Sequence, residues 1–257
     1  YGTPEARELS ATRSHNTITV DQRDASSGIA DAWQNSADGF DFFAGHNDGY
    51  HGLEVAHHRR IFFLRPTDDQ PPWWIVFDDV VGNGRHRADL NWRFAPLAVR
   101  HSAPDRRVWT EEGDGNLMLQ VLGPSKGEGS GEAIDFQMGK GIAVWRELTD
   151  VPVATFSQEA DLPIAFTTLI APFEGNAVPE ITSHTVTALP SGTGARAVWI
   201  EMGDRAVLAA VDRLDARMQA PSELTIPVPG AKSMAVRAHA IARRYDRVGD
   251  AWQETNP

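Results

Sequence analysis

The sequence predicts an all-β fold, a large antiparallel β-sandwich with very little helix. Short apolar runs rich in Val, Ile, Phe and Trp follow one another along the chain, and runs of this length and composition are typical of strands. Gly-Asp and Asp-Gly pairs separate several of them and favour tight turns, because glycine adopts positive φ without steric cost. No long segment has the 3.6-residue apolar period that a helix would need.

The apolar runs predict the strands in chain order. The first five cover residues 12–20, 40–44, 53–64, 73–80 and 89–94, and the next four cover 117–122, 142–146, 153–158 and 164–170. The last five cover residues 181–189, 195–202, 206–212, 224–228 and 234–245. Residues 26–33 and 211–218 are the two candidates for short helices. We expect one domain over residues 1–257, with a subdivision near 175–195 as the alternative, because prolines cluster there.

The composition excludes several classes of protein. The formal net charge is −11, which argues against non-specific nucleic-acid binding, since that requires a basic face. No apolar run approaches the roughly 20 residues of a membrane-spanning helix. The chain has no cysteine, so it has neither disulfides nor thiolate metal sites. Local basic clusters at residues 57–60, 85–87 and 100–107 can still meet an acidic polysaccharide at short range.

Five sequence blocks follow one another in an order that resembles the heparinase II/III-like polysaccharide lyases. They are RSHNTITVD at 13–21, GHNDGY at 45–50, HHRR at 57–60, WWIVFDD at 73–79 and FTTLIAP at 166–172. The resemblance is to the C-terminal β-domain of that family, which includes heparinase and alginate lyase relatives. It runs from residue 1 to about residue 175.

Two His residues and one Asp form a candidate zinc site. Asp41 lies in an otherwise apolar strand, where a carboxylate is costly unless it is paired or binds a cation. Neighbouring strands could bring it together with His15 and His58, a ligand set that suits zinc with water as the fourth ligand. The resemblance also implies a His, Asp, His zinc site. We prefer His58 as the third ligand because it directly precedes Arg59, and His57 and His86 are the alternatives.

The resemblance implies a catalytic role for Tyr50. In the lyase reaction, a base removes the C5 proton of a uronic acid and an acid protonates the departing glycosidic oxygen, and a Tyr can serve in either step. The alternative is that Tyr50 is a turn aromatic that covers the edge of the sandwich. His46 and His51 flank it and are candidates for substrate binding. Arg59 and Arg60 could neutralise a uronate carboxylate, although consecutive strand residues face opposite sides of a sheet.

The predicted function is that of the β-sandwich part of a polysaccharide lyase that cleaves uronic-acid glycans by β-elimination. The family's helical toroid domain, which precedes the β-domain, has no counterpart in the sequence, and the chain begins with Tyr rather than Met. We therefore expect the chain to be part of a longer protein and to be inactive by itself. A bacterial periplasmic or secreted location is expected, and the composition also fits the cytoplasm.

Two other functions fit the sequence. The first is a non-catalytic carbohydrate-binding or scaffolding β-domain that docks on a separate helical catalytic domain. The second is a different sugar-processing sandwich with two facing carboxylates, for which only the Glu111-Glu112 pair is a candidate.

Overall fold

The computed structural model describes residues 4–25, 30–37, 39–50, 52–68, 70–123, 134–144, 147–214, 220–230 and 232–255. Within these ranges, one short helix, α1 (Pro4–Ser10), and one 3-10 turn, η1 (Thr12–Ser14), accompany nineteen strands. All the strand ladders in these ranges are antiparallel. The predicted all-β antiparallel fold with very little helix is confirmed.

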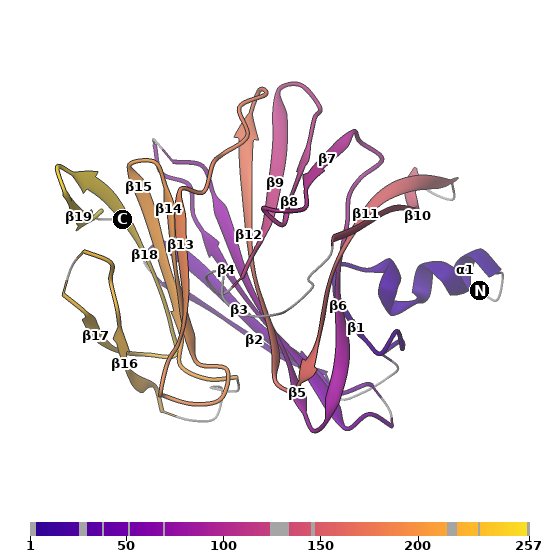
Figure 1. Cartoon of the computed structure of the whole chain (residues 1–257), viewed down its shortest axis with the longest axis horizontal. Coiled ribbons are helices and arrows are strands. Elements are labelled where there is room, and N and C mark those ends of the chain that lie inside the picture. The colour runs from indigo at the N-terminus through magenta and orange to yellow at the C-terminus, as the bar shows by residue number, and fades with distance from the viewer. Residues whose placement is uncertain are drawn as a thin grey trace.

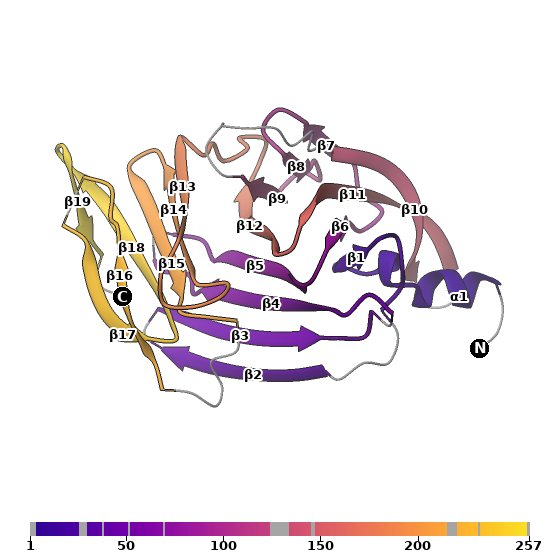
Figure 2. The same ribbon diagram turned by 60° about the horizontal axis from the view of Figure 1, so that its bottom comes forward.

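The strands form four sheets, and the strands of each sheet are named below in their spatial order. The four-stranded sheet contains β1 (Ile18–Val20), β6 (Arg85–Arg93), β11 (Glu147–Asp161) and β10 (Ile134–Val144). The eight-stranded sheet contains β2 (Ala30–Ala37), β3 (Phe40–Asn47), β4 (Val55–Leu64), β5 (Trp73–Gly82), β12 (Ile164–Glu174), β9 (Gly115–Leu122), β8 (Arg107–Thr110) and β7 (Val99–Ser102). Figure 2 shows β2 to β5 lying side by side in this sheet.

The remaining strands form the C-terminal sheets. The five-stranded sheet contains β13 (Ser183–Ala188), β14 (Arg196–Met202), β15 (Arg205–Val211), β18 (Ala240–Val248) and β19 (Ala251–Glu254). The two-stranded sheet contains β16 (Ser222–Ile226) and β17 (Met234–Ala238).

The sheets are stacked in layers (Figure 1). A hydrophobic core fills the space between each neighbouring pair of sheets. Ile18 of the four-stranded sheet shares a core with Phe166 of the eight-stranded sheet. On the other face of the eight-stranded sheet, Phe62 shares a core with Val198 of the five-stranded sheet. A third core joins the five-stranded and two-stranded sheets. The eight-stranded sheet is therefore covered on both faces.

Burial on both faces explains the sequence of β5. Its residues Trp73 to Val80 are buried except for the half-buried Trp74, so the strand reads as a nearly continuous apolar run rather than as an alternation. The two aspartates in this run, Asp78 and Asp79, are therefore placed inside the molecule, at 0% and 2% exposure. A buried carboxylate is costly unless it is paired and hydrogen-bonded.

The predicted subdivision near residues 175–195 coincides with a change of sheet. The last strand of the eight-stranded sheet, β12, ends at Glu174, and the first strand of the five-stranded sheet, β13, begins at Ser183. The two sheets share one hydrophobic core. Whether the chain folds as one unit or two stays a prediction.

The structure differs from several sequence predictions. Residues 30–33 of the predicted helix at 26–33 belong to strand β2, and residues 26–29 lie outside the described residues. The short helix α1, the short strands β7 and β8 and most of β10 were not predicted. These segments are short or lie at or next to sheet edges, where they bury few apolar side chains and leave a weak pattern. Within the described part of the chain, no helix is long and apolar enough to span a membrane.

Candidate functional site

The HHRR block on β4 pairs with the end of the apolar run on β5. In the register of these strands, Arg59 lies opposite Asp78, and His58 lies opposite Asp79. Consecutive side chains on a strand point to opposite faces, so Asp78 faces the four-stranded sheet and Asp79 faces the five-stranded sheet. Two separate charged clusters result, one on each face.

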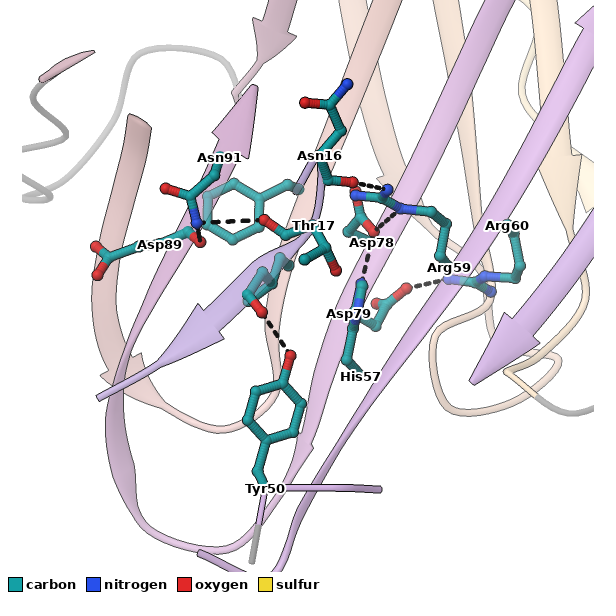
Figure 3. Close-up of polar contacts among 12 residues, drawn as sticks. Asn16, Thr17, Tyr50, His57, Arg59, Arg60, Asp78, Asp79, Asp89 and Asn91 are labelled. Carbon is teal, nitrogen blue, oxygen red and sulfur yellow. Dashed lines mark hydrogen bonds and ion pairs between the residues drawn. The ribbon is translucent and has the colours of Figure 1, made fainter. Parts of the chain in front are cut away.

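The Asp78 cluster consists of His57, Arg59 and Asp78 (Figure 3). His57 Nε2 lies 2.7 Å from Asp78 Oδ1, and the Arg59 guanidinium donates to both carboxylate oxygens, at 2.7 Å and 3.1 Å. Arg59 also donates to the backbone carbonyl of Asn16. Burial by itself would raise the pKa of Asp78, but the charge of Arg59 and the hydrogen bond from His57 outweigh it and hold the pKa well below its usual value.

The Asp79 cluster consists of Arg60, Asp79 and Arg196. Asp79 accepts hydrogen bonds from Arg60 and, at 3.0 Å, from Arg196 of the five-stranded sheet. Arg196 also donates to the backbone carbonyl of Phe166 at 2.9 Å, and Arg60 donates to that of Gly194 at 2.9 Å. The cluster therefore joins two sheets. Burial lowers the pKa of Arg60 to about 10, which leaves it charged at neutral pH.

Tyr50 lies in the core between the four-stranded and eight-stranded sheets. Its side chain is 2% exposed, and its hydroxyl donates to the backbone carbonyl of Ile18 at 2.5 Å (Figure 3). Burial raises the pKa of this phenol, and the charge of Asp78 adds to the effect. A catalytic phenol would need to be exposed at the edge of the sandwich, but Tyr50 is not, because it is buried in one core with Ile18 and Val20 of β1.

His46 and His58 are cross-strand neighbours whose rings stack with their centroids 5.3 Å apart. Burial lowers the pKa of His58 to about 4, and the neighbouring His46 contributes. His58 is therefore neutral at physiological pH. His51, the other candidate near Tyr50, lies outside the described residues.

Comparison with known proteins identifies the family. The family model described as heparinase II/III-like, C-terminal, matches residues 1–189, which is most of the chain. The chain belongs to this family. No curated protein sequence matches it.

Solved structures share the fold of this heparinase II/III-like domain. The heparan sulfate lyase HepC from Pedobacter heparinus has a TM-score of 0.69 at 18% identity, over 84% of this chain and 33% of that chain. A heparinase III described as the BT4657 gene product has a TM-score of 0.64 at 17% identity, over 79% and 31%. A further heparinase III has a TM-score of 0.61 at 12% identity, over 80% and 31%. The heparinase II/III-like domain spans about a third of the length of these proteins.

The predicted zinc ligands do not converge in this heparinase II/III-like domain. Asp41 lies opposite Phe63, five positions along β4 from His58, which is about 17 Å at the rise of a strand. It pairs instead with Arg65 at 2.5 Å, and the hydrogen bonds from Arg65 and Ser36 lower its pKa to about 2. His15 is exposed before β1.

The alternative zinc ligands are also engaged elsewhere. His57 contacts Asp78, and His86 lies between Asp21 and the backbone carbonyl of Asn83, at 2.8 Å and 2.9 Å. The described residues contain no group of three or more His, Cys, Asp or Glu side chains that could hold a metal ion. Within the described part of the chain, the predicted ligands do not come together as a zinc site, and zinc binding by this protein stays a prediction.

The predicted substrate-binding residues are differently placed. Arg60 is 1% exposed, so a glycan cannot reach its guanidinium in this structure. Arg59 keeps 18% of its side chain exposed, although Asp78 occupies its guanidinium. His46 is half-buried beside His58. The binding roles of Arg59 and His46 stay predictions.

Sequence reasoning missed Asp78, Asp79 and Arg196. A signal was present for the first two, because two consecutive carboxylates interrupt an apolar run that pairs with an Arg-Arg block. Arg196 gave no such signal, since it is 117 residues from Asp79 along the chain.

The Glu111-Glu112 pair does not form two facing carboxylates. Glu111 pairs with Arg100 at 2.7 Å, and Glu112 accepts a hydrogen bond from the Ala98 amide at 3.2 Å.

Proposed function

We propose that this chain is the β-domain of a polysaccharide lyase that cleaves uronic-acid glycans by β-elimination. The observation that carries the proposal is the match of residues 1–189 to the heparinase II/III-like C-terminal family. The fold shared with a heparan sulfate lyase supports it. The acidic glycan would be the substrate of the whole protein, with a helical toroid domain preceding the β-domain and a periplasmic or secreted location in bacteria.

Within that enzyme, we propose a supporting role for the β-domain rather than a chemical one. Proton transfer in β-elimination requires a base at C5 and an acid at the glycosidic oxygen, and each must reach the substrate. The hydroxyl of Tyr50 is bonded to the Ile18 carbonyl inside the core, and Arg60 is bonded to Asp79. These contacts favour the interpretation in which both groups hold the sheets together and the helical domain supplies the acid and base.

The Tyr50→Phe variant of the full-length protein separates the two roles. This change keeps the ring and removes only the hydroxyl. In the supporting role, turnover of heparan sulfate and alginate, followed by the ultraviolet absorbance of unsaturated uronate products, stays within a few-fold of wild type. Thermal stability falls slightly because the buried Ile18 carbonyl loses its donor.

A loss of turnover of about 10² or more, with an unchanged melting temperature, would assign proton transfer to Tyr50 after all. Absence of unsaturated products from the wild-type full-length protein on every uronic-acid glycan tried would contradict the lyase proposal itself.

A further inference from the structure

Asn83 and Gly84 form the only Asn-Gly pair of the sequence. They lie in the short connection between β5 of the eight-stranded sheet and β6 of the four-stranded sheet, and both are exposed. The amide nitrogen that follows an asparagine can attack the asparagine side-chain carbonyl carbon. A glycine in the second position offers the least hindrance to this attack, because it has no Cβ.

Both reacting groups of this pair are accessible for such an attack. Within the described part of the chain, neither the Gly84 amide nor the Asn83 side chain has a hydrogen-bond partner, so the attack breaks no hydrogen bond. Asn116 is the opposite case. It is 6% exposed, its side-chain oxygen accepts a hydrogen bond from the Glu112 amide at 2.7 Å, and its side-chain nitrogen donates to the Gly175 carbonyl at 2.8 Å.

His86 lies against the peptide bond that joins Asn83 to Gly84. Its Nε2 is 2.9 Å from the Asn83 backbone carbonyl oxygen, and its Nδ1 is 2.8 Å from the Asp21 carboxylate. Both partners are acceptors, and a neutral imidazole has only one N–H, so both contacts are hydrogen bonds only when the ring is protonated. The hydrogen bond to Asp21 raises the pKa of His86, and the Arg87 amide holds the Asp21 carboxylate in place at 2.9 Å.

We propose that Asn83 is a site of spontaneous conversion to isoaspartate and that His86 promotes the conversion. In the first step, the Gly84 nitrogen gives its proton to water and bonds to the side-chain carbonyl carbon of Asn83. That carbon expels its amide group as ammonia, and a succinimide ring closes. In the second step, water opens the ring, so the net change is the loss of ammonia and the gain of water. Attack of water at the side-chain carbonyl gives aspartate, and attack at the backbone carbonyl gives isoaspartate.

The position of His86 favours both steps. A proton donor on the Asn83 backbone oxygen draws electrons from that peptide group, which makes the Gly84 N–H more acidic. After ring closure, the same donor faces the backbone carbonyl and stabilises the negative charge that develops on its oxygen when water attacks there. Ring opening is therefore directed toward isoaspartate, whose new carboxylate lies against the His86 imidazolium. The product also has one more main-chain carbon in the connection between the two sheets.

Incubation of the folded protein in neutral buffer, followed by peptide mass analysis and enzymatic methylation of isoaspartate, tests the proposal. We expect the peptide that contains residue 83 to show the mass change from amide to acid and to become a methylation substrate. Asn116 in the same sample is the internal control and should stay unchanged. Asn83→Gln should abolish the isoaspartate signal, because its longer side chain would have to close a larger ring.

Two variants test the role of His86. His86→Phe keeps a ring without an N–H, and it should slow the conversion about three- to tenfold and lower the share of isoaspartate relative to aspartate. His86→Gln keeps an N–H donor and should restore part of both effects. Melting temperatures will show that the variants are folded. In urea the contact with His86 is lost without a mutation, so the share of isoaspartate in the wild-type protein should also fall.

The outcomes separate the two parts of the proposal. If Asn83 in the folded protein stays intact for as long as Asn116, the modification site is overturned. If His86→Phe and urea both leave the ratio of isoaspartate to aspartate unchanged, His86 has no part in the conversion. None of these measurements depends on the proposed lyase activity.

Discussion

The buried aspartates Asp78 and Asp79 are the residues on which the interior of this domain depends most. Each would cost several kcal/mol as an isolated charge in a low-dielectric interior. Each instead meets an arginine of the neighbouring strand, Arg59 on one face and Arg60 on the other. The consecutive pairs Arg59-Arg60 and Asp78-Asp79 thus neutralise one another on both sides of the same sheet.

Replacing Asp78 by Asn should destabilise the domain by about 3–5 kcal/mol, because the partly buried Arg59 would lose the carboxylate with which it pairs inside the molecule. Asp41→Asn, at an exposed ion pair, is the control and should shift the melting temperature little. Because the folded-state pKa of Asp78 lies below its usual value, its contribution is complete above about pH 4 and is lost as the pH falls through the folded pKa. Urea unfolding should therefore show the gap between wild type and Asp78→Asn narrowing in acid; a gap that stays constant would contradict the assignment.

At the scale of strands, the approach of β5 to the start of β4 depends on one glycine. Gly82 ends β5 opposite Val55, and its φ is 145°. A Cβ at this position would overlap the backbone carbonyl oxygen of Glu54. Backbone cannot move aside as the end of a flexible side chain can, so only glycine fits at this position.

We expect Gly82→Ala to destabilise the domain by about 1–3 kcal/mol, the usual cost of a residue held in an unfavourable backbone region. The matched control is Gly115→Ala at the start of β9, where a Cβ meets nothing within 4 Å. Chemical denaturation of the two variants side by side is the measurement. Equal effects of both changes would show that the contact with Glu54 is relieved without cost.

At the scale of the whole molecule, the sheets are held by shared cores rather than by separate ones. The core between the eight-stranded and five-stranded sheets takes Phe62 and Phe77 from one and Val198 and Val207 from the other. The Asp79 cluster crosses the same interface through Arg196. Removal of either sheet would expose the apolar face of the other.

The shared core predicts that the domain unfolds in one cooperative transition, although the chain changes sheet between residues 175 and 195. Scanning calorimetry should give a calorimetric enthalpy equal to the van't Hoff enthalpy. The Arg196→Met variant should unfold at a different midpoint temperature from wild type, but its thermal unfolding should remain a single transition. Two resolved transitions in the wild-type protein would instead support a domain boundary in this region.

The sequence by itself determined the class of fold and the family. Alternating or continuous apolar runs with glycine turns, such as Gly203 between β14 and β15, are local signals, and they predicted most of the strands. The ordered blocks from Arg13 to Pro172 predicted the heparinase II/III-like family. These features could be predicted because they depend on neighbouring residues and on residue order.

Only the tertiary structure decided what the candidate site residues do. Tyr50 is buried because β1, from far earlier in the chain, supplies the Ile18 carbonyl and covers it. Asp41 is kept from His58 by the register of β3 on β4, and Asp79 is paired by Arg196 of another sheet. The pairing of distant strands decides both the register and the covering layer, and a one-residue shift would turn every side chain to the other face. The local pattern of residues does not show which distant strands will pair or in which register.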